Sequence, residues 1–85
     1  MRATKVSIWR ADNEPTYELN HGSYKLHKGE ACLKLKLHKA EAAGLPTDDL
    51  DYWSVVCTTK NGDVISSFVT KTEKKNGWLH LKLKV

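Results

Sequence analysis

The sequence contains few of the residues that build disulfide frameworks or metal sites. Its only two cysteines, Cys32 and Cys57, are far apart in the chain, and each lies within a strand-like run. We therefore expect two free, buried thiols and no disulfide. The four histidines show neither the H-x-x-x-H spacing nor the cysteine-histidine spacing of metal ligands. These shortages favour a protein that binds no metal and no cofactor.

Long apolar runs and targeting signals are also lacking. No stretch approaches the roughly 18 apolar residues that a membrane-spanning helix needs. Residues 1–15 contain no apolar core of the kind found in secretory signals. We therefore expect a cytoplasmic protein that does not contact a membrane.

No catalytic motif stands out in the sequence. Asp48, Asp49 and Asp51 lie close together, but helix capping and turn formation explain acidic residues in such a segment. The glycine-containing segments at 29–31 and 61–63 are too short to be phosphate-binding loops. We expect a non-enzymatic protein, because nothing in the sequence fixes the geometry of reacting groups. An enzyme would need a deep pocket with a perturbed titratable group.

The composition is that of a small globular domain with a basic surface. The 85 residues, 40% hydrophobic and 28% charged, indicate a single β-rich domain over residues 1–85. A chain this small buries little apolar surface, so association with a second copy would stabilise it. The net charge of +4 and the isoelectric point of about 9.1 favour a polyanionic partner.

Alternating apolar and polar residues predict about seven short strands. The turn signals between them include Asn61-Gly62 and Asn76-Gly77, the dipeptides most typical of tight hairpins. The predicted strands cover residues 4–10, 15–19, 23–28, 30–37, 52–59, 64–72 and 78–85.

One short helix interrupts the strand pattern near the middle of the chain. Residues 38–44 contain good helix formers and end at Gly44, and Pro46 follows two residues later. Together the elements predict a mainly β fold. We expect a small barrel or sandwich of antiparallel strands and hairpins, with one short helix near residues 38–44.

Two of the predicted strands place apolar residues on one face and basic residues on the other. Because strand side chains alternate between the two faces, the apolar set should be buried and the basic set exposed. Two interpretations of the lysines remain open: they keep a sheet face soluble, or they contact the phosphates of a nucleic acid. The apolar set is Leu33, Leu35, Leu37, Leu79, Leu81, Leu83 and Val85, and the basic set is Lys34, Lys36, His38, His80, Lys82 and Lys84.

Four consecutive segments carry a family resemblance. "YKLHKGEACLKLKL", "HKAEAAGL", "PTDDLD" and "YWSVVCTT" follow the order of strand, glycine turn, strand, alanine-rich helix ending in Gly-Leu, acidic turn and strand. Over roughly residues 25–59 this order resembles the AbrB/SpoVT family of swapped-hairpin DNA-binding domains, although His38 stands where that family has a proline. The resemblance implies an interleaved homodimer that binds DNA through Lys25, Lys28, Lys34, Lys36 and Lys39.

The sequence therefore favours a small basic protein that binds nucleic acid. We expect DNA rather than RNA as the partner, a homodimer as the assembly and transcription regulation as the role. The alternative is a protein-protein interaction module, such as a small inhibitor or adaptor of a mobile element. Trp78 lies outside the leucine face and is the aromatic residue first expected at the surface. The residues expected to bind nucleic acid are Lys25, Lys28, Lys34, Lys36, Lys39, Lys82, Lys84 and Trp78.

Overall fold

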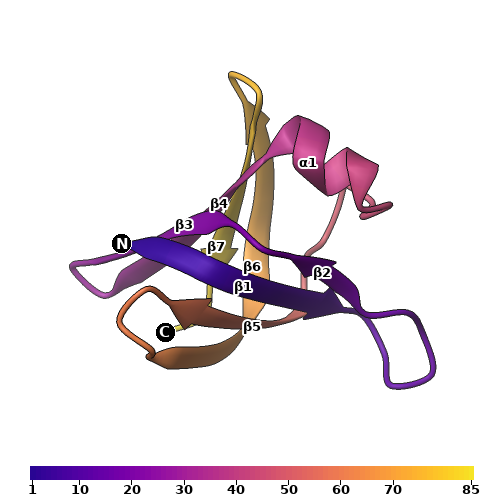
Figure 1. Ribbon diagram of the computed structural model, residues 1–85. Helices are drawn as coiled ribbons and strands as arrows, with labels where there is room; N and C mark the ends of the chain where they lie inside the picture. The colour runs from indigo at the N-terminus through magenta and orange to yellow at the C-terminus, as the bar shows by residue number, and fades with distance from the viewer.

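The computed structural model describes residues 1–85 and contains seven strands and one short helix (Figure 1). The mainly β fold with one short helix that the sequence predicts is confirmed. No helix in the structure is long and apolar enough to cross a membrane. The elements are β1 (Arg2–Trp9), β2 (Tyr17–Leu19), β3 (Gly22–His27), β4 (Glu30–Lys36), α1 (Leu37–Ala42), β5 (Ser54–Thr59), β6 (Val64–Lys75) and β7 (Trp78–Leu83).

The strands form one sheet that closes on itself. Their order is β2-β1-β3-β4-β7-β6-β5, and β1 also pairs with β5. Six strands therefore make a closed barrel, to which β2 adds an extra strand beside β1. All pairs are antiparallel. Closure leaves few unpaired strand edges at the surface.

Tight turns fix the register of the hairpins. At the β6–β7 turn, Asn76 and Gly77 have φ angles of 53° and 79°. Two positive φ angles are typical of the type I′ turn, whose twist matches that of the flanking strands. This turn confirms the hairpin that Asn76-Gly77 predicts. It places Lys75 opposite Trp78, and the β6–β7 register follows from that pair as far as Lys71 opposite Lys82, beyond which β6 shifts.

The core fills the interior of the barrel with alternate strand side chains. Leu35 and Leu81 are fully buried, as predicted. The predicted exposure of Lys34 and His80 is wrong, because these cross-strand neighbours are half-buried within the sheet. Three predictions of burial are also wrong. Leu37 is half-buried because β4 ends at Lys36 and the helix begins, and Cys32 is half-buried because it faces outward. Val85 is 68% exposed because β7 ends at Leu83.

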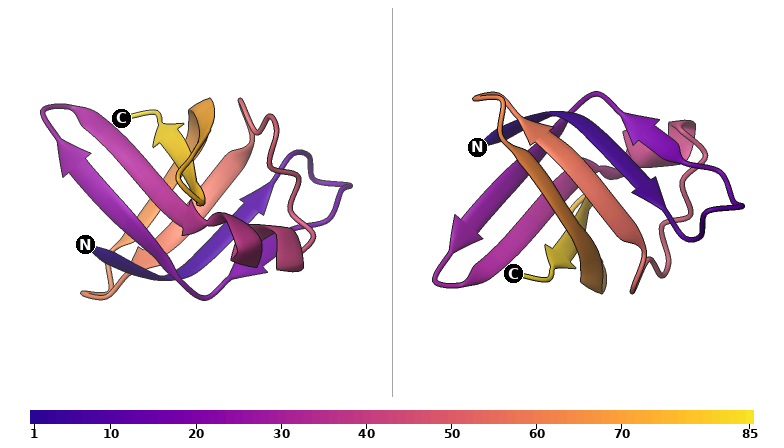
Figure 2. Two further views of the ribbon diagram at one scale, coloured as in Figure 1. Left: turned by 90° about the horizontal axis from the view of Figure 1, so that it is seen from above. Right: turned by 90° about the horizontal axis from the view of Figure 1, so that it is seen from below.

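Helix α1 and the segment after it close one end of the barrel, which we call the capped end. The helix is shorter than predicted, because Gly44 takes a φ of 81° and Leu45 N–H donates to the Ala40 carbonyl at 3.0 Å. Ala40, Leu45 and Leu50 are at most 3% exposed and join the barrel core. Both termini and the β3–β4 and β5–β6 turns lie toward the opposite end, which we call the open end (Figures 1 and 2).

Candidate nucleic-acid interface

The two lysine rows predicted from sequence lie on neighbouring strands. Strand β4 pairs with β7 so that Lys34 is opposite His80 and Lys36 is opposite Trp78. Lys82 is opposite Cys32. The lysines of the two strands are therefore staggered, which avoids the repulsion of like charges placed directly opposite. The rows merge into one outward-facing surface.

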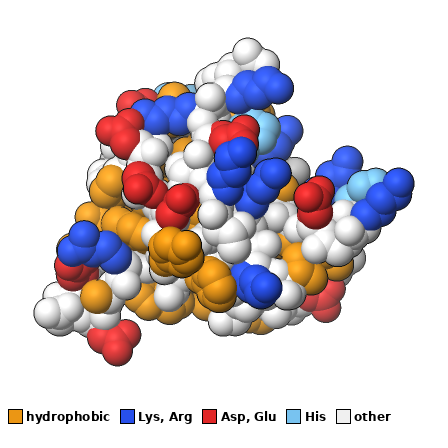
Figure 3. Space-filling view, turned by 180° about the vertical axis from the view of Figure 1, so that it is seen from behind, with side chains coloured by type: hydrophobic (Ala, Val, Ile, Leu, Met, Phe, Trp, Pro, Cys, Tyr) orange, Lys and Arg blue, Asp and Glu red, His pale blue; other side chains and the backbone are white.

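The strands on either side of β4 and β7 widen this surface. On β3, Lys25 is opposite Cys32, and on β6, Lys71 is opposite Lys82 and Lys75 is opposite Trp78. Figure 3 shows lysine and histidine side chains close together in the upper half of the view, interrupted by a few acidic groups. We call this surface the basic face, and its members are Lys25, Lys34, Lys36, Lys71, Lys75, Lys82, His80, Trp78, Cys32 and Glu73.

Trp78 lies within the basic face. It is half-buried, and the Lys34 ammonium lies 5.0 Å from the centre of its ring. Such a cation over an indole face is attracted by the negative potential of the ring. Lys36 and Lys75 are the cross-strand neighbours of Trp78 on its two sides. An aromatic ring surrounded by cations is an arrangement that suits a nucleotide base with its phosphates.

Acidic side chains neutralise only part of this charge. Lys71 pairs with Glu73 at 3.0 Å, and this hydrogen bond and the lysine charge lower the pKa of the Glu73 carboxyl. Lys74, which lies on the other side of β6, pairs with Asp48 at 2.5 Å. The lysines of the basic face that have no ion-pair partner in the chain are Lys25, Lys34, Lys36, Lys75 and Lys82.

Three other lysines expected at the interface lie at its margins. Lys28 is in the β3–β4 turn, where its φ is 51°, and it is exposed. Lys84 is exposed just beyond the end of β7, and its backbone N–H donates to the Phe68 carbonyl at 3.0 Å. Lys39 is exposed on α1. The structure thus brings four expected lysines together with Trp78 and leaves three around them.

His21 joins the basic face to the helix. Both nitrogens of its ring are buried and lack a hydrogen-bond partner. Burial lowers the pKa of His21, and the nearby charges of Lys39, Lys36 and His38 lower it further. Burial and the neighbouring basic side chains therefore both favour the neutral imidazole over the protonated one.

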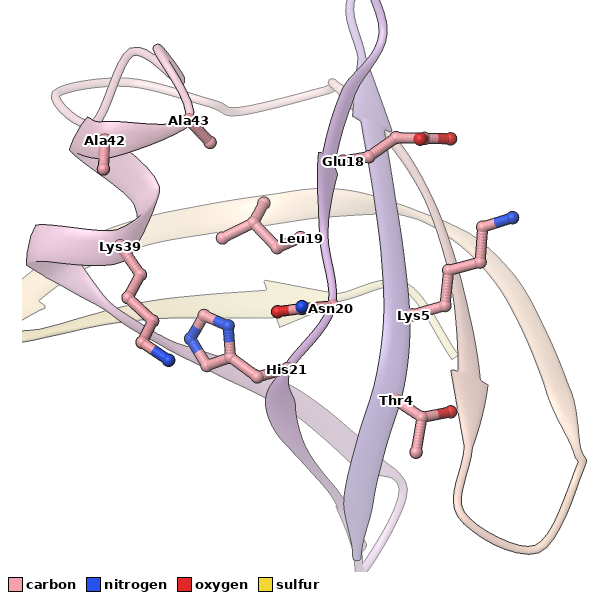
Figure 4. Close-up of a pocket in the computed structure, with 9 residues that line it drawn as sticks. All are labelled: Thr4, Lys5, Glu18, Leu19, Asn20, His21, Lys39, Ala42 and Ala43. Carbon is pink, nitrogen blue, oxygen red and sulfur yellow. The ribbon is translucent and has the colours of Figure 1, made fainter.

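A hollow in the surface lies between α1 and β1–β2 and has a volume of about 600 Å³. Figure 4 shows Lys39 and His21 on the helix side, whereas Lys5 and Glu18 point away from them. The reacting groups of an active site converge on one point, and the polar groups of this hollow do not. No three His, Cys, Asp or Glu side chains are grouped so that they could hold a metal ion.

Sequence reasoning missed Lys71 and Lys75 because their segment does not alternate with leucines. The signal that would have found Lys75 is the Asn76-Gly77 turn, since a two-residue hairpin loop pairs the residues on either side of it. The expectation that Trp78 is the aromatic residue first found at the surface is also wrong. Tyr52, at 79% exposure, is the most exposed large aromatic side chain, whereas Trp78 is half-buried.

The predicted thiols are free, and neither has the environment of a reactive cysteine. Burial raises the pKa of Cys32 and of Cys57, so both favour the protonated, unreactive form.

Comparison of the chain with protein-family models, with curated proteins and with solved structures found no match.

Proposed function

We propose that this protein binds nucleic acid through the basic face. The observation that carries the proposal is the merging of two lysine rows around Trp78 on adjacent strands. Lysines that contact phosphates release condensed counterions, which favours binding irrespective of sequence. The role is non-enzymatic, with DNA as the favoured partner and transcription regulation as the favoured context.

The resemblance to the AbrB/SpoVT family supports the same set of lysines on β3 and β4. In that family's interleaved dimer, hairpins are exchanged between chains. Here β1 pairs with β5 of the same chain and closes the barrel. A homodimer of this protein would therefore join two barrels that are each complete.

The salt dependence of binding tests the proposal. We expect Lys34→Gln/Lys36→Gln to keep the fold, because both side chains face outward. The slope of log K against log salt for duplex DNA should become shallower by up to about 1.8, because each lysine that reaches a phosphate contributes about 0.9 to it. Fluorescence anisotropy with a labelled duplex at several salt concentrations measures this slope.

A matched control separates the basic face from net charge. Lys5→Gln/Lys60→Gln removes two exposed lysines from β1 and from the β5–β6 turn, outside the basic face. Its slope should equal that of the wild-type protein. The proposal fails if the β4 variant binds with unchanged affinity and slope, or if both variants bind equally weakly.

Trp78 distinguishes single strands from duplexes. If its ring stacks on a base, Trp78→Ala weakens single-stranded binding by about 1 to 3 kcal/mol and affects duplex binding less. The alternative function, a protein-protein interaction module using a sheet edge and Trp78, predicts no salt-dependent binding to either nucleic acid.

A further inference from the structure

Two basic side chains lie together in the hollow between α1 and β1–β2. Lys39 on α1 and His21, just before β3, both line it, and Figure 4 shows the Lys39 side chain extending toward the His21 ring. The Asn20 side chain lies on the same side of the hollow. The polar groups of the hollow as a whole do not meet at one point, but these three neighbours do form one polar corner. We call it the His21 corner.

The His21 ring lacks the partners that a buried imidazole needs. Both of its nitrogens are buried without a hydrogen-bond partner, and no other side-chain nitrogen or oxygen in the chain is in this condition. Buried polar atoms are almost always hydrogen-bonded, because an unpaired one is destabilising. A ligand oxygen at this corner would supply the acceptor that the chain does not provide.

The charges that surround the ring are all of one sign. Lys39 and His38 on α1 and Lys36 at the end of β4 are the charged groups near it. Glu18, the acidic residue that lines the hollow, points away from the corner, and Lys39 has no ion-pair partner in the chain. The positive charge at the corner is therefore not neutralised by the protein itself, which favours an anionic ligand.

We infer that the hollow is an anion site, in which a phosphate group binds between Lys39, His21 and Asn20. The lysine ammonium and the protonated ring donate hydrogen bonds to the phosphate oxygens. Lys39 is exposed, so its side chain is free to turn and admit the phosphate to the ring. The volume of about 600 Å³ is typical of small-molecule sites. The inference does not depend on the basic face, because the phosphate can belong to a free molecule as well as to a nucleic acid.

NMR titration of the histidine ring signals tests the site. Sulfate serves as the probe, since it has the shape of a phosphate group and keeps its charge where histidines titrate, from about pH 5 to about pH 8. In sulfate, compared with chloride at equal ionic strength, protonation of His21 should move to higher pH, because an anion beside the ring favours the charged form. The signals of His27, which lies toward the open end, should be the same in both salts.

A matched pair of lysine variants separates the corner from net charge. Lys39→Gln should weaken sulfate binding about tenfold, the usual loss when a charged hydrogen-bond donor is removed. Lys60→Gln removes an exposed lysine from the β5–β6 turn and should leave the response of His21 unchanged. The inference is overturned if sulfate does not affect His21, if it affects His27 equally, or if Lys39→Gln responds like the wild-type protein.

Competition against bound sulfate identifies the source of the phosphate group. A single-stranded oligonucleotide should displace sulfate from the corner if the phosphate belongs to a nucleic acid that lies on the basic face, and Lys34→Gln/Lys36→Gln should then weaken the displacement. Displacement by inorganic phosphate alone assigns the site to free phosphates. Displacement by neither would overturn the inference. Failure of the oligonucleotide to bind anywhere would contradict the proposed function but leave the sulfate response of His21 intact, so the two failures are distinguishable.

Discussion

The two ends of the barrel differ in how far the chain buries its apolar side chains. At the capped end, α1 and the segment to β5 bury Leu45 and Leu50 in the same core as the strands. At the open end, Leu26 and Met1 are 58% and 57% exposed around a hollow. Strand pairing alone therefore closes the wall of a small barrel and leaves its ends to be covered by something else.

This difference shows where a short chain places its limited apolar surface. Burying a leucine contributes about 1.5 to 3 kcal/mol, so a covered end stabilises the monomer and an uncovered one does not. The capped end is thus part of the folding unit. The open end contributes little to the stability of a single copy, and its apolar surface is free for contact with another molecule.

The largest expected difference between the two ends is in the loss of stability when a leucine is truncated to alanine. Leu50→Ala should lower the free energy of unfolding by about 2 to 5 kcal/mol, because it leaves a cavity in a fully buried site. Leu26→Ala should cost less than about 1 kcal/mol at concentrations where the protein is monomeric. Urea unfolding of both variants decides the matter, and similar destabilisation of the two would contradict the contrast between the ends.

A smaller effect concerns the bond that holds the capping segment to β6. The Leu50 N–H donates to Thr72 Oγ1 at 3.0 Å, and that hydroxyl donates to Asp51 Oδ1 at 2.8 Å. Thr72→Val leaves the partly buried N–H without an acceptor and should cost about 1 to 3 kcal/mol.

Thr70 provides the matched control for this change, since its exposed hydroxyl donates to the Lys82 carbonyl at 3.2 Å. Thr70→Val should change thermal stability by no more than about 0.5 kcal/mol. If both valine variants melt at the same temperature, the bond to Leu50 does not secure the capping segment.

The smallest expected effect is a pH dependence of stability that arises at the capped end, where His21 lies beside α1. Because the pKa of His21 is lowered in the folded protein, the unfolded chain takes up a proton that the folded one resists. The stability associated with neutral His21 is complete above the ordinary value of 6.5 and declines as the pH falls below it toward the folded pKa.

The variant His21→Gln removes this titration. Its free energy of unfolding, measured by urea titration from about pH 5 to about pH 8, should vary less with pH than that of the wild-type protein below 6.5. An identical pH dependence in the two proteins would contradict the assignment to His21.

Local pattern was sufficient to predict most of the fold. Alternation in strands β4 and β7 correctly placed Leu35 and Leu81 inside and Lys36 and Lys82 outside. The pattern failed for Val85, because alternation continues in the sequence after strand pairing has ended. Burial depends on neighbours, and the sequence does not say where the neighbouring strand stops.

The candidate site was predictable only in part, because it depends on strand order. Each lysine row could be read from its own strand, but their merging requires β4 beside β7, and these strands are separated in the chain by α1, β5 and β6. Lys71 follows from the unbroken register of the β6–β7 turn, but that register ends there, because β6 shifts between Val69 and Lys71. Bulges of this kind leave no reliable signal in a single sequence.

The pairing of β1 with β5 has a consequence for the way the protein folds. The β3–β4, β5–β6 and β6–β7 hairpins join neighbouring segments and can form in about 1 to 10 µs, whereas β1 and β5 come from opposite halves of the chain. Closing so long a loop costs chain entropy before any interaction compensates for it. We therefore expect the hairpins to form first and the long-range pairings, β1–β5 together with β4–β7, to limit the folding rate. Until those pairings form, these strands have unpaired edges, so the slowest step is also the one at which the chain is most prone to aggregate.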